Sequence, residues 1–467
     1  ISDMNMCDTE AAGQNPRTVQ RVGDGITESM KGVSKCLART ETNGESNLME
    51  EIADWENVYK AFLKVRANKG CPGVDRMTIE EAGLIIREQW EFYRTLLRKG
   101  LYHPLPVLGV SIPKPDGGTR QLGIPTVIDR VIQQAIVQKI ERRFDVEFSE
   151  RSYGFRKGRS AHQALQQARE YVAEGRRWVV DIDIAKFFDR VNHDILMAKV
   201  ARKVHDKRVL KLIRLYLQAG LMTGGLISPR TEGCPQGGPL SPLLSNIMLD
   251  TLDKELERRG HCFCRYADDC NIYVKSKKAA ERVFASVTSF LETKLKLKIN
   301  QTKSMVARPW KAKFLGYTMT ANQKPKLKPS PVSVKRFKNS LQKIYFMARG
   351  WSFQDTVRAL KPKINGYAAY FCLSETKATW EELDQWLRHK MRCLIWQRWK
   401  KPKTRYKNLI RWGIDPETAR KAAGNGRGAW WNSHQSHMHR AFPNAWLKKH
   451  GLLSLLEITE CLRARKA

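Results

Sequence analysis

Two stretches decide the fold of this chain: HCFCRYADDCNIYV at residues 261–274 and WVVDIDIA at residues 178–185. Both are rich in the β-branched and aromatic residues that favour strands. The first predicts two short strands joined by a tight turn. In the second, Asp181 and Asp183 are two residues apart and therefore share one face, while the alternating apolar residues can face a core.

The adjacent acids Asp268 and Asp269 lie at the predicted turn. Neighbouring carboxylates repel each other, and a divalent cation such as Mg²⁺, which prefers carboxylate and phosphate oxygens, relieves that repulsion. If the strand and the hairpin lie side by side, Asp183 joins this pair in a site able to hold two metal ions, as nucleotidyl transfer requires. An isolated pair of acids at a turn is more often only solvated, so the rest of the chain has to decide.

The composition indicates an anionic partner. The chain has 467 residues, with 83 Lys and Arg against 47 Asp and Glu, giving a net charge of +36, and 42% of its residues are hydrophobic. The apolar content excludes a wholly disordered chain, and the charge favours binding to nucleic acid or an anionic membrane. No apolar run approaches the ~20 residues of a membrane span. The start, ISDMNMCDTE, resembles no targeting signal, and the scattered Cys residues suit a reducing compartment. We therefore expect a cytoplasmic protein.

The pattern of elements is α+β. Residues 1–46 are polar and acidic, which predicts a flexible tail. Apolar residues at helical spacing between Leu48 and Val65, Trp55 and Tyr59 among them, predict one helix that Gly70-Cys71-Pro72-Gly73 ends. Further helices are expected at 79–98, 127–144, 160–175 and 278–295. The Lys/Pro-rich segments 324–333 and 399–407 are interpreted as linkers. Residues 321–467 hold 31 basic and 9 acidic residues, a net charge of +22.

Six ordered motifs together resemble a reverse transcriptase, specifically the group II intron-encoded branch. Tyr266-Ala267-Asp268-Asp269 resembles the signature tetrapeptide of these enzymes. The other motifs are IPKPDGG with Arg120 (from 112), YGFR continuing through RSA (153–161), Asp183 with Phe187-Phe188, GCPQGGPLSP (233–242) and FLGY (314–317). The resemblance covers roughly residues 47–460. Six motifs in order are far more specific than one acidic pair.

The resemblance implies the site residues. Two Mg²⁺ ions would be held at Asp183, Ile184, Asp268 and Asp269, with the three carboxylates catalytic, while Asp181 matches no metal-binding position. The incoming dNTP would be clamped by Lys114 and Arg120, since a guanidinium bonds triphosphate oxygens bidentately. Phe188 would be a steric gate against ribonucleotides. Gln236 and Gly237 would pack beside the nascent base pair.

The C-terminal part resembles the maturase domain, or thumb, at 361–399, followed by a short DNA-binding region like that of enzymes from group IIC introns. Its apolar stripes are interpreted as helix-bundle core, and its dense positive charge as phosphate-binding. Trp430 and Trp431 either stack on bases or pack in the fold. The expected nucleic-acid contacts are Arg156, Arg159, Lys303, Gly316, Arg388, Arg392, Lys400, Lys401, Lys403 and Arg405.

Metal-like patterns elsewhere are interpreted as structural. His434, His437 and His439 lack nearby thiols or carboxylates, and Cys262 and Cys264 fill one face of a strand as small apolar residues. Paired CxxC ligands are absent after Cys393. We therefore expect no zinc nuclease, and integration that uses an existing DNA 3′ end as primer.

The sequence thus predicts a right-hand polymerase: an N-terminal extension and the start of the fingers at 47–105, fingers and a β-sheet palm at 106–320, a helical thumb at 321–400 and a basic DNA-binding tail at 401–467. The implied activity is RNA-directed DNA synthesis combined with maturase function in splicing and retrohoming. The implied partners are group II intron RNA, an RNA template with a DNA primer, a DNA target and dNTPs, with no membrane. The resemblance also implies a bacterial protein associated with the nucleoid. Two alternatives stay open: a splicing-only RNA-binding factor, which the intact carboxylates disfavour, and a domesticated enzyme of defence or DNA repair.

Overall fold

The structure is a computed structural model that describes residues 47–113 and 118–465, so the predicted tail and Lys114 lie outside the described residues. The described chain forms two compact units. The first unit comprises the described residues up to Ser149, then Ala185–Leu252 and Leu291–Lys298. The second comprises Glu150–Ile184, Asp253–Phe290 and the chain from Ile299 onward. Each unit is therefore assembled from segments far apart in the sequence.

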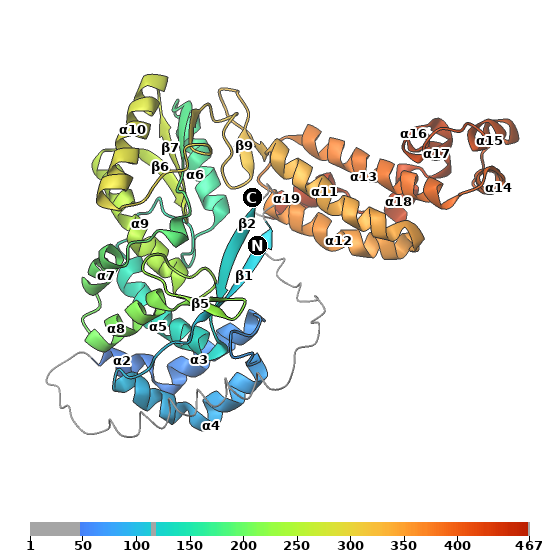
Figure 1. Ribbon diagram of the computed structural model, residues 1–467. Coiled ribbons are helices and arrows are strands. Elements are labelled where there is room, and N and C mark those ends of the chain that lie inside the picture. Colours follow the sequence, from blue (N-terminus) through green and yellow to red (C-terminus); the bar gives the residue numbers. More distant parts are fainter. Residues whose placement is uncertain (1–46, 114–117, 466–467) are drawn as a thin grey trace. The chain divides into compact units, whose positions relative to one another are not determined.

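The first unit combines helices with a four-stranded sheet of order β2-β1-β4-β5 (Figure 1). Strand β1 (Val107–Pro113) pairs antiparallel with β2 (Thr119–Ile124) and parallel with β4 (Leu221–Thr223), which forms a hairpin with β5 (Leu226–Ser228). The helices are α2 (Leu48–Ile52), α3 (Trp55–Ala67), α4 (Ile79–Arg98), α5 (Val127–Asp145), α7 (His193–Ala201) and α8 (Lys207–Gln218). The expected helices at 79–98 and 127–144 are thus confirmed, the second ending one residue later.

The single helix expected before the stop at Gly70 is wrong, because this segment forms two helices, α2 and α3. It is broken at Asp54, whose side chain accepts a hydrogen bond from the Glu56 N–H at 3.1 Å and so caps a new helix, α3. Val58, Phe62 and Val65 of the expected stripe are buried, whereas Trp55 and Tyr59 are 44% and 48% exposed and stack on each other.

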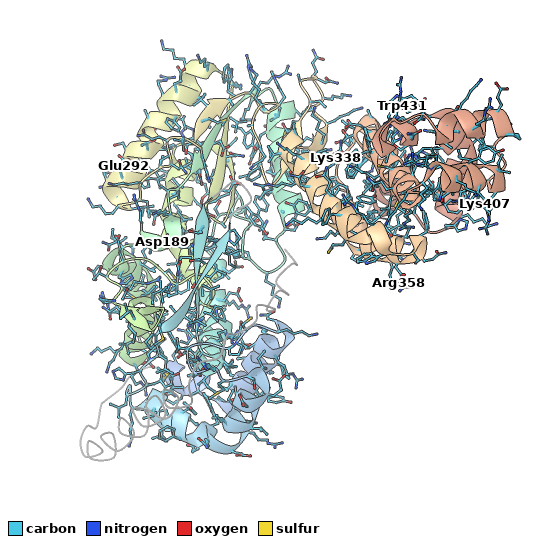
Figure 2. The ribbon with its side chains drawn as sticks, turned by 45° about the vertical axis from the view of Figure 1, so that its right-hand side comes forward. Asp189, Glu292, Lys338, Arg358, Lys407 and Trp431 are labelled. Carbon is cyan, nitrogen blue, oxygen red and sulfur yellow. The ribbon has the colours of Figure 1, made fainter. Side chains whose placement is uncertain are left out.

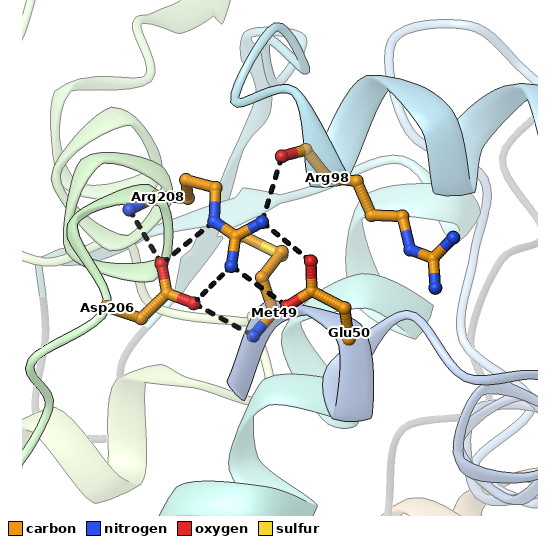
Figure 3. Close-up of polar contacts among 5 residues, drawn as sticks. All are labelled: Met49, Glu50, Arg98, Asp206 and Arg208. Carbon is orange, nitrogen blue, oxygen red and sulfur yellow. Dashed lines mark hydrogen bonds and ion pairs between the residues drawn. The ribbon is translucent and has the colours of Figure 1, made fainter. Parts of the chain in front are cut away.

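Arg208 on α8 holds helix α2 in place (Figure 3). Its guanidinium bonds both carboxylate oxygens of Glu50, at 2.7 and 2.9 Å, and the Asp206 carboxylate at 2.9–3.1 Å. Asp206 is fully buried and also accepts from the Met49 N–H at 3.0 Å. A helix of only five residues is too short to be stable alone, so this network fixes it to the unit.

The second unit is built on an antiparallel sheet of order β6-β7-β3-β8. Its strands are β6 (Cys262–Tyr266), β7 (Asp269–Val274), β3 (Trp178–Asp183) and β8 (Met305–Ala307). Helix α6 (Ala161–Ala173) packs on β6 and β7 (Figure 1). Helices α9 (Ser241–Arg258) and α10 (Lys277–Lys294) precede and follow the hairpin in the sequence, and α9 belongs to the first unit up to Leu252. The predicted strands and hairpin are confirmed. So are the helices expected at 160–175 and 278–295, with ends shifted by one or two residues.

A helical bundle in the second unit follows the sheet (Figure 1). It contains α11 (Pro331–Met347), α12 (Phe353–Tyr370), α13 (Lys377–Arg398) and the last helix, α19 (Leu455–Ala464), which packs on α12 and α13. The expected apolar stripes do form its core, as the burial of Ile364, Leu383 and Met391 shows. Asp384 ties α19 down by accepting from the Leu455 N–H at 2.7 Å and the Ser454 hydroxyl at 2.6 Å.

Both segments interpreted as linkers contain regular structure, so that interpretation is wrong. The segment 324–333 contains β10 (Leu327–Pro329), which pairs with β9 (Tyr317–Met319), and the start of α11 at Pro331. The segment 399–407 contains the start of α14 (Pro402–Arg411). In both helices Pro stands in the first turn, where its missing N–H costs nothing. The remaining helices are α15 (Pro416–Ala423), α16 (Ala429–Ser433), α17 (Ser436–Ala441) and α18 (Asn444–Lys449).

No helix among the described residues is both long enough and apolar enough to cross a membrane.

Candidate active site

The register of the second unit's sheet brings the three acids together. Asp183, the last residue of β3, stands directly opposite Asp269, the first residue of β7. Side chains at directly opposite positions of an antiparallel pair have Cβ atoms about 4.5–5.5 Å apart. Asp269 is also paired with Tyr266, so Ala267 and Asp268 form the two-residue turn between β6 and β7. The three carboxylates therefore lie at one end of the sheet.

Each of these acids makes the ionised form of its neighbours less favourable. The pKa of Asp269 is raised well above its usual range by burial, with contributions from Asp181 and Asp268. Burial, and then Asp183, raises the pKa of Asp181 to about 7. Lys313 opposes both shifts. A cation placed among these groups would restore their charged forms.

The donor set fits a divalent cation that the substrate helps to bind. Within residues 47–113 and 118–465, no three His, Cys, Asp or Glu side chains are gathered closely enough to form a complete metal site. Mg²⁺ in polymerase sites takes only one or two carboxylates and fills its other positions with phosphate oxygens and water. Asp183, Asp268 and Asp269 supply such carboxylates. Ile184 can add only its main-chain carbonyl, because its side chain is apolar and buried.

Arg265, which sequence reasoning missed, holds the turn in place. It is fully buried and forms a two-pronged ion pair with the equally buried Asp253 at 2.7 and 2.6 Å. It also donates to the Ser152 hydroxyl at 2.7 Å and to the Ala267 carbonyl at 2.9 Å. Ala267 has a φ of +58°, a conformation in which a side chain is strained. The bond from Arg265 therefore stabilises the unusual turn that carries Asp268.

Gly154 supports the same turn by its lack of a side chain. A Cβ at this position would lie 2.2 Å from the Ala267 nitrogen. Only glycine allows the backbone of residue 154 to come this close. This explains physically why the YGFR motif and the YADD motif belong to one site.

Two further residues position Asp183. Asn300 donates from its side chain to Asp183 Oδ2 at 3.2 Å, and its main-chain N–H donates to the Asp183 carbonyl at 2.8 Å. The Ser304 hydroxyl accepts from the Asp183 N–H at 2.9 Å. No motif in the sequence marks either residue. Both come into place because the turn before β8 runs beside the end of β3.

In the first unit, three of the expected dNTP-binding residues are gathered. Arg120 on β2 is exposed, and its Nε donates to Gln236 Oε1 at 2.6 Å. The Gln236 carbonyl accepts from the Gly123 N–H at 2.9 Å. Gly237 has a φ of +139°, and a Cβ there would lie 2.5 Å from the Gly123 carbonyl oxygen. The loop therefore needs glycine to lie against β2.

Phe188 is linked to the same loop by its main chain. Its carbonyl accepts a 2.6 Å hydrogen bond from the Cys234 N–H. Its half-buried ring meets the buried ring of Phe187 edge-on, with centroids 5.2 Å apart. Part of the Phe188 ring thus remains accessible, whereas Phe187 belongs to the core.

The expected nucleic-acid contacts near the sheet are in varied surroundings. Arg156 is buried and donates to the Ser152 carbonyl at 3.0 Å. Arg159 pairs with Glu150. Lys303 is exposed in the turn before β8. Gly316 has a φ of +80°, and its carbonyl accepts from the Ser333 hydroxyl at 2.8 Å, which connects the FLGY turn to α11.

Among the C-terminal basic residues, Arg392 is a correction. It is only 1% exposed and donates to the Phe442 carbonyl at 3.0 Å and to Asn444 Oδ1 at 2.8 Å. Because this guanidinium is satisfied inside the fold, the structure contradicts the expectation that it contacts nucleic acid. The other expected contacts are accessible: Lys400, Lys401 and Lys403 are exposed, and Arg388 and Arg405 are half-buried.

The two tryptophans, His434 and His439 are exposed on the C-terminal helices, whereas His437 and His389 are buried. Trp430 and Trp431 are 42% and 38% exposed, with Lys390 Nζ 4.7 Å from the Trp430 ring centroid. Figure 2 labels Trp431 and, on the same helical region, Lys407. His434 stacks on His389 with ring centroids 3.6 Å apart. This is a ring-packing arrangement.

Two family models match the chain. "Reverse transcriptase (RNA-dependent DNA polymerase)" matches residues 112–319, and "Group II intron, maturase-specific domain" matches residues 334–413. The first match spans the carboxylates of β3 and β7 and the loop around Gln236. The second covers most of the bundle formed by α11, α12 and α13.

Similar proteins agree with these matches. Protein YkfC of Escherichia coli is 34% identical over 323 residues, 60% of this chain and 84% of YkfC. Group II intron-encoded protein LtrA of Lactococcus lactis is 27% identical over 383 residues, 66% of this chain and 64% of LtrA. The putative COX1/OXI3 intron 1 protein of Saccharomyces cerevisiae is 28% identical over 274 residues, 56% of this chain and 31% of that protein. The chain thus spans less than two thirds of the last two relatives.

The chain belongs to the group II intron-encoded reverse transcriptase and maturase family. Its fold is that of a right-hand polymerase followed by a helical maturase domain. It is an RNA-directed DNA polymerase that uses a divalent metal ion and binds intron RNA and nucleic-acid substrates.

Proposed function

We propose that this enzyme copies intron RNA into DNA from the 3′ end of a DNA target, with two Mg²⁺ ions held at Asp183, Asp268 and Asp269, and so supports retrohoming. The observation that carries the proposal is the register in which Asp183 faces Asp269 across β3 and β7, next to the turn that holds Asp268. When bound, the two ions would activate the primer 3′-hydroxyl and stabilise the pyrophosphate leaving group.

The chain's own residues position the reacting groups. Asn300 holds the Asp183 carboxylate, and Arg265 holds the main chain of the turn that carries Asp268, before any substrate arrives. Such preorganisation lowers the barrier because no reorganisation is needed during the reaction. Arg120, held by Gln236, would bond the triphosphate of the incoming dNTP together with Lys114. Phe188 would exclude a ribose 2′-hydroxyl.

The maturase part would hold RNA through the exposed basic residues of the C-terminal helices. Residues 321–467 carry a net charge of +22. Counterion release makes such a surface bind phosphate backbones with a strong dependence on salt. Lys400, Lys401, Lys403, Arg388 and Arg405 are the proposed contacts, while Lys303, Arg159 and the turn at Gly316 would lie along the template and primer.

Primer extension on poly(rA)/oligo(dT) with Mg²⁺ and dTTP tests the polymerase. We expect synthesis by the wild type, none above background by Asp268→Ala, and wild-type synthesis by Glu292→Ala, which removes an exposed acid on α10 (Figure 2). Equal activity of both variants would overturn the proposed metal site. A splicing assay with the intron RNA that flanks the gene then separates a maturase from a domesticated polymerase.

A further inference from the structure

A groove runs between α11 and α13 of the helical bundle, and neither the polymerase site nor the family match assigns it a ligand. It holds about 490 Å³ of space that is open to solvent. The lining residues form two stripes at helical spacing, Gln342, Tyr345, Phe346 and Arg349 from α11 and its 3₁₀ extension, and Lys390, Cys393, Leu394 and Gln397 from α13.

The two stripes run in the same direction. Near their start, Lys338 on α11 lies 5.8 Å from the Trp386 ring centroid on α13 (Lys338 is labelled in Figure 2). Near their end, Arg398 donates to the Ala348 carbonyl at 3.2 Å. Each end of the groove therefore combines one cation with one side-chain amide, Lys390 with Gln342 and Arg349 with Gln397.

The middle of the groove is aromatic and apolar. Leu394 and Cys393 are buried on one wall. On the other wall, Phe346 is 66% exposed, an unusual environment for a large apolar side chain. Arg349 lies over this ring, 4.6 Å from its centroid. The flat apolar surface is thus already part of a stack with a guanidinium.

The floor of the groove contains an unsatisfied hydroxyl. Tyr345 is 8% exposed, and its Oη has no hydrogen-bond partner within the described part of the chain. A buried polar group without a partner is destabilising. Because this Oη is itself enclosed, the Tyr345 ring forms part of the floor while its hydroxyl does not reach the open groove.

We propose that this groove binds a single unstacked nucleotide of the RNA, with its base against Phe346 and Tyr345 and its flanking phosphates at Lys390 and Arg349. The proposal rests on the RNA binding of the maturase domain and names a site for it. Unstacked bases are recognised by stacking on aromatic rings and guanidinium planes and by hydrogen bonds to their edges. Gln342 and Gln397 offer such bonds. Because the eight lining residues include two cations and no acid, the groove suits an anion better than the apolar helix of a partner protein.

The test uses the full chain and a pentaribonucleotide, UU(2-aminopurine)UU, whose fluorescence falls when the modified base stacks. Wild type should quench it in saturable fashion. Phe346→Ala should weaken this binding roughly tenfold, as expected for the loss of one stacked base. Met347→Ala is the matched control, since Met347 is the next residue on α11, is 55% exposed and does not line the groove.

Two further variants separate the chemical contributions. Lys390→Gln should reduce the slope of log affinity against log salt by about 0.7, the value for one phosphate of a single strand, whereas Phe346→Ala should leave the slope unchanged. Tyr345→Phe removes only a hydroxyl that the groove does not expose, and it should leave binding unchanged. Inorganic polyphosphate should compete with the oligonucleotide for the cations of the groove. Because it has no base, it should not reproduce the quenching.

Equal quenching by Phe346→Ala and Met347→Ala would overturn the groove proposal. So would the absence of quenching by a wild type that binds a 15-nucleotide RNA in a parallel anisotropy titration. That titration keeps the two proposals apart. If the wild type binds the 15-nucleotide RNA but does not quench the fluorescence, only the groove proposal is contradicted. If folded wild type binds no RNA at all, the maturase function is contradicted as well.

Discussion

Arg265 and Asp253 form a buried ion pair in which the guanidinium bonds both carboxylate oxygens, at 2.7 and 2.6 Å. The same guanidinium donates to the Ala267 carbonyl in the turn that carries Asp268. The hairpin turn is thereby connected to helix α9, which contains Asp253. The position of a proposed metal-binding acid thus depends on an ion pair that cannot itself reach substrate.

Replacing this arginine tests that dependence. Arg265→Lys keeps the charge but loses the planar fork that bonds three partners at once. We expect kcat for primer extension to fall roughly 10- to 100-fold, because small displacements of positioning groups have effects of this size, with little change in the KM for dTTP. Steady-state kinetics with varied dTTP measures both constants.

The matched control for this change is Arg259→Lys. Arg259 also pairs with an acid on α9, Glu255, but its side chain is partly exposed. Its kcat should remain at the wild-type value. An increase in the KM for dTTP with an unchanged kcat in Arg265→Lys would contradict a positioning role.

Gly154→Ala should disable the enzyme by displacing the same turn. The new Cβ would meet the Ala267 nitrogen at 2.2 Å, and a main-chain atom cannot yield as the end of a flexible side chain can. We expect polymerase activity to drop at least as far as in Arg265→Lys, measured by primer extension. In Gly366→Ala, on α12, the new methyl group would meet nothing within 4 Å, so this control should retain activity. Wild-type activity of Gly154→Ala would show that the turn tolerates the shift.

Asp129 should make the stability of the protein depend on pH. It is buried, receives hydrogen bonds from Tyr102 and Thr126 at 2.8 Å, and burial raises its pKa to about 6. The folded state therefore binds its proton more tightly than the unfolded chain, where the pKa is about 3.9. The stabilisation from the Asp129 proton is present in full below pH ~4 and is lost as the pH rises through 6. The free energy of unfolding thereby decreases by about 3 kcal/mol.

Urea unfolding between pH 4.5 and 7.5 measures this effect. Asp129→Asn cannot ionise, so its free energy of unfolding should lack this decrease. Asp145→Asn, which changes an acid at the end of the same helix, serves as the control and should follow the wild type. Identical pH dependence in Asp129→Asn and wild type would contradict the assignment.

Arg208→Met should destabilise the first unit, because it leaves the fully buried Asp206 without its cation (Figure 3). Removing one partner of a buried pair costs about 3–5 kcal/mol, and partial exposure of Arg208 and Glu50 should bring the loss toward ~2–3 kcal/mol. Arg214→Met, which breaks the exposed pair with Asp194, should cost less than ~1 kcal/mol. Chemical denaturation compares them, and equal losses would show that the network does not anchor α2.

Much of the fold could be predicted because it follows local patterns. The alternation in WVVDIDIA and the adjacent acids of YADD predict two strands with carboxylates that meet, and the structure places Asp183 opposite Asp269. Motif order then supplied the enzyme family. The helix break at Asp54 was missed because the apolar spacing continues through it, although Asp before a run of helix formers is a capping signal.

The supporting residues of the site could not be predicted for a different reason. Arg265 and Asp253 are twelve residues apart on a strand and a helix, and Asn300 is more than a hundred residues from Asp183. Such contacts depend on how elements pack and leave no periodic signal. Arg392 shows the converse, since a basic residue in a basic region looked exposed but is buried by the later helices.

The pairing of β3 with β7 also bears on which changes the gene can tolerate. Successive residues of a strand point to opposite faces, so one residue inserted between Tyr266 and Asp269 would either lengthen the turn or shift β7 along β3. A shift would replace Asp269 by a neighbour opposite Asp183 and turn its carboxylate toward the other face. Substitutions on the surface of this hairpin can accumulate during evolution, but insertions and deletions cannot. Among diverging copies, the spacing of the acids should therefore be kept even where the residues around them change.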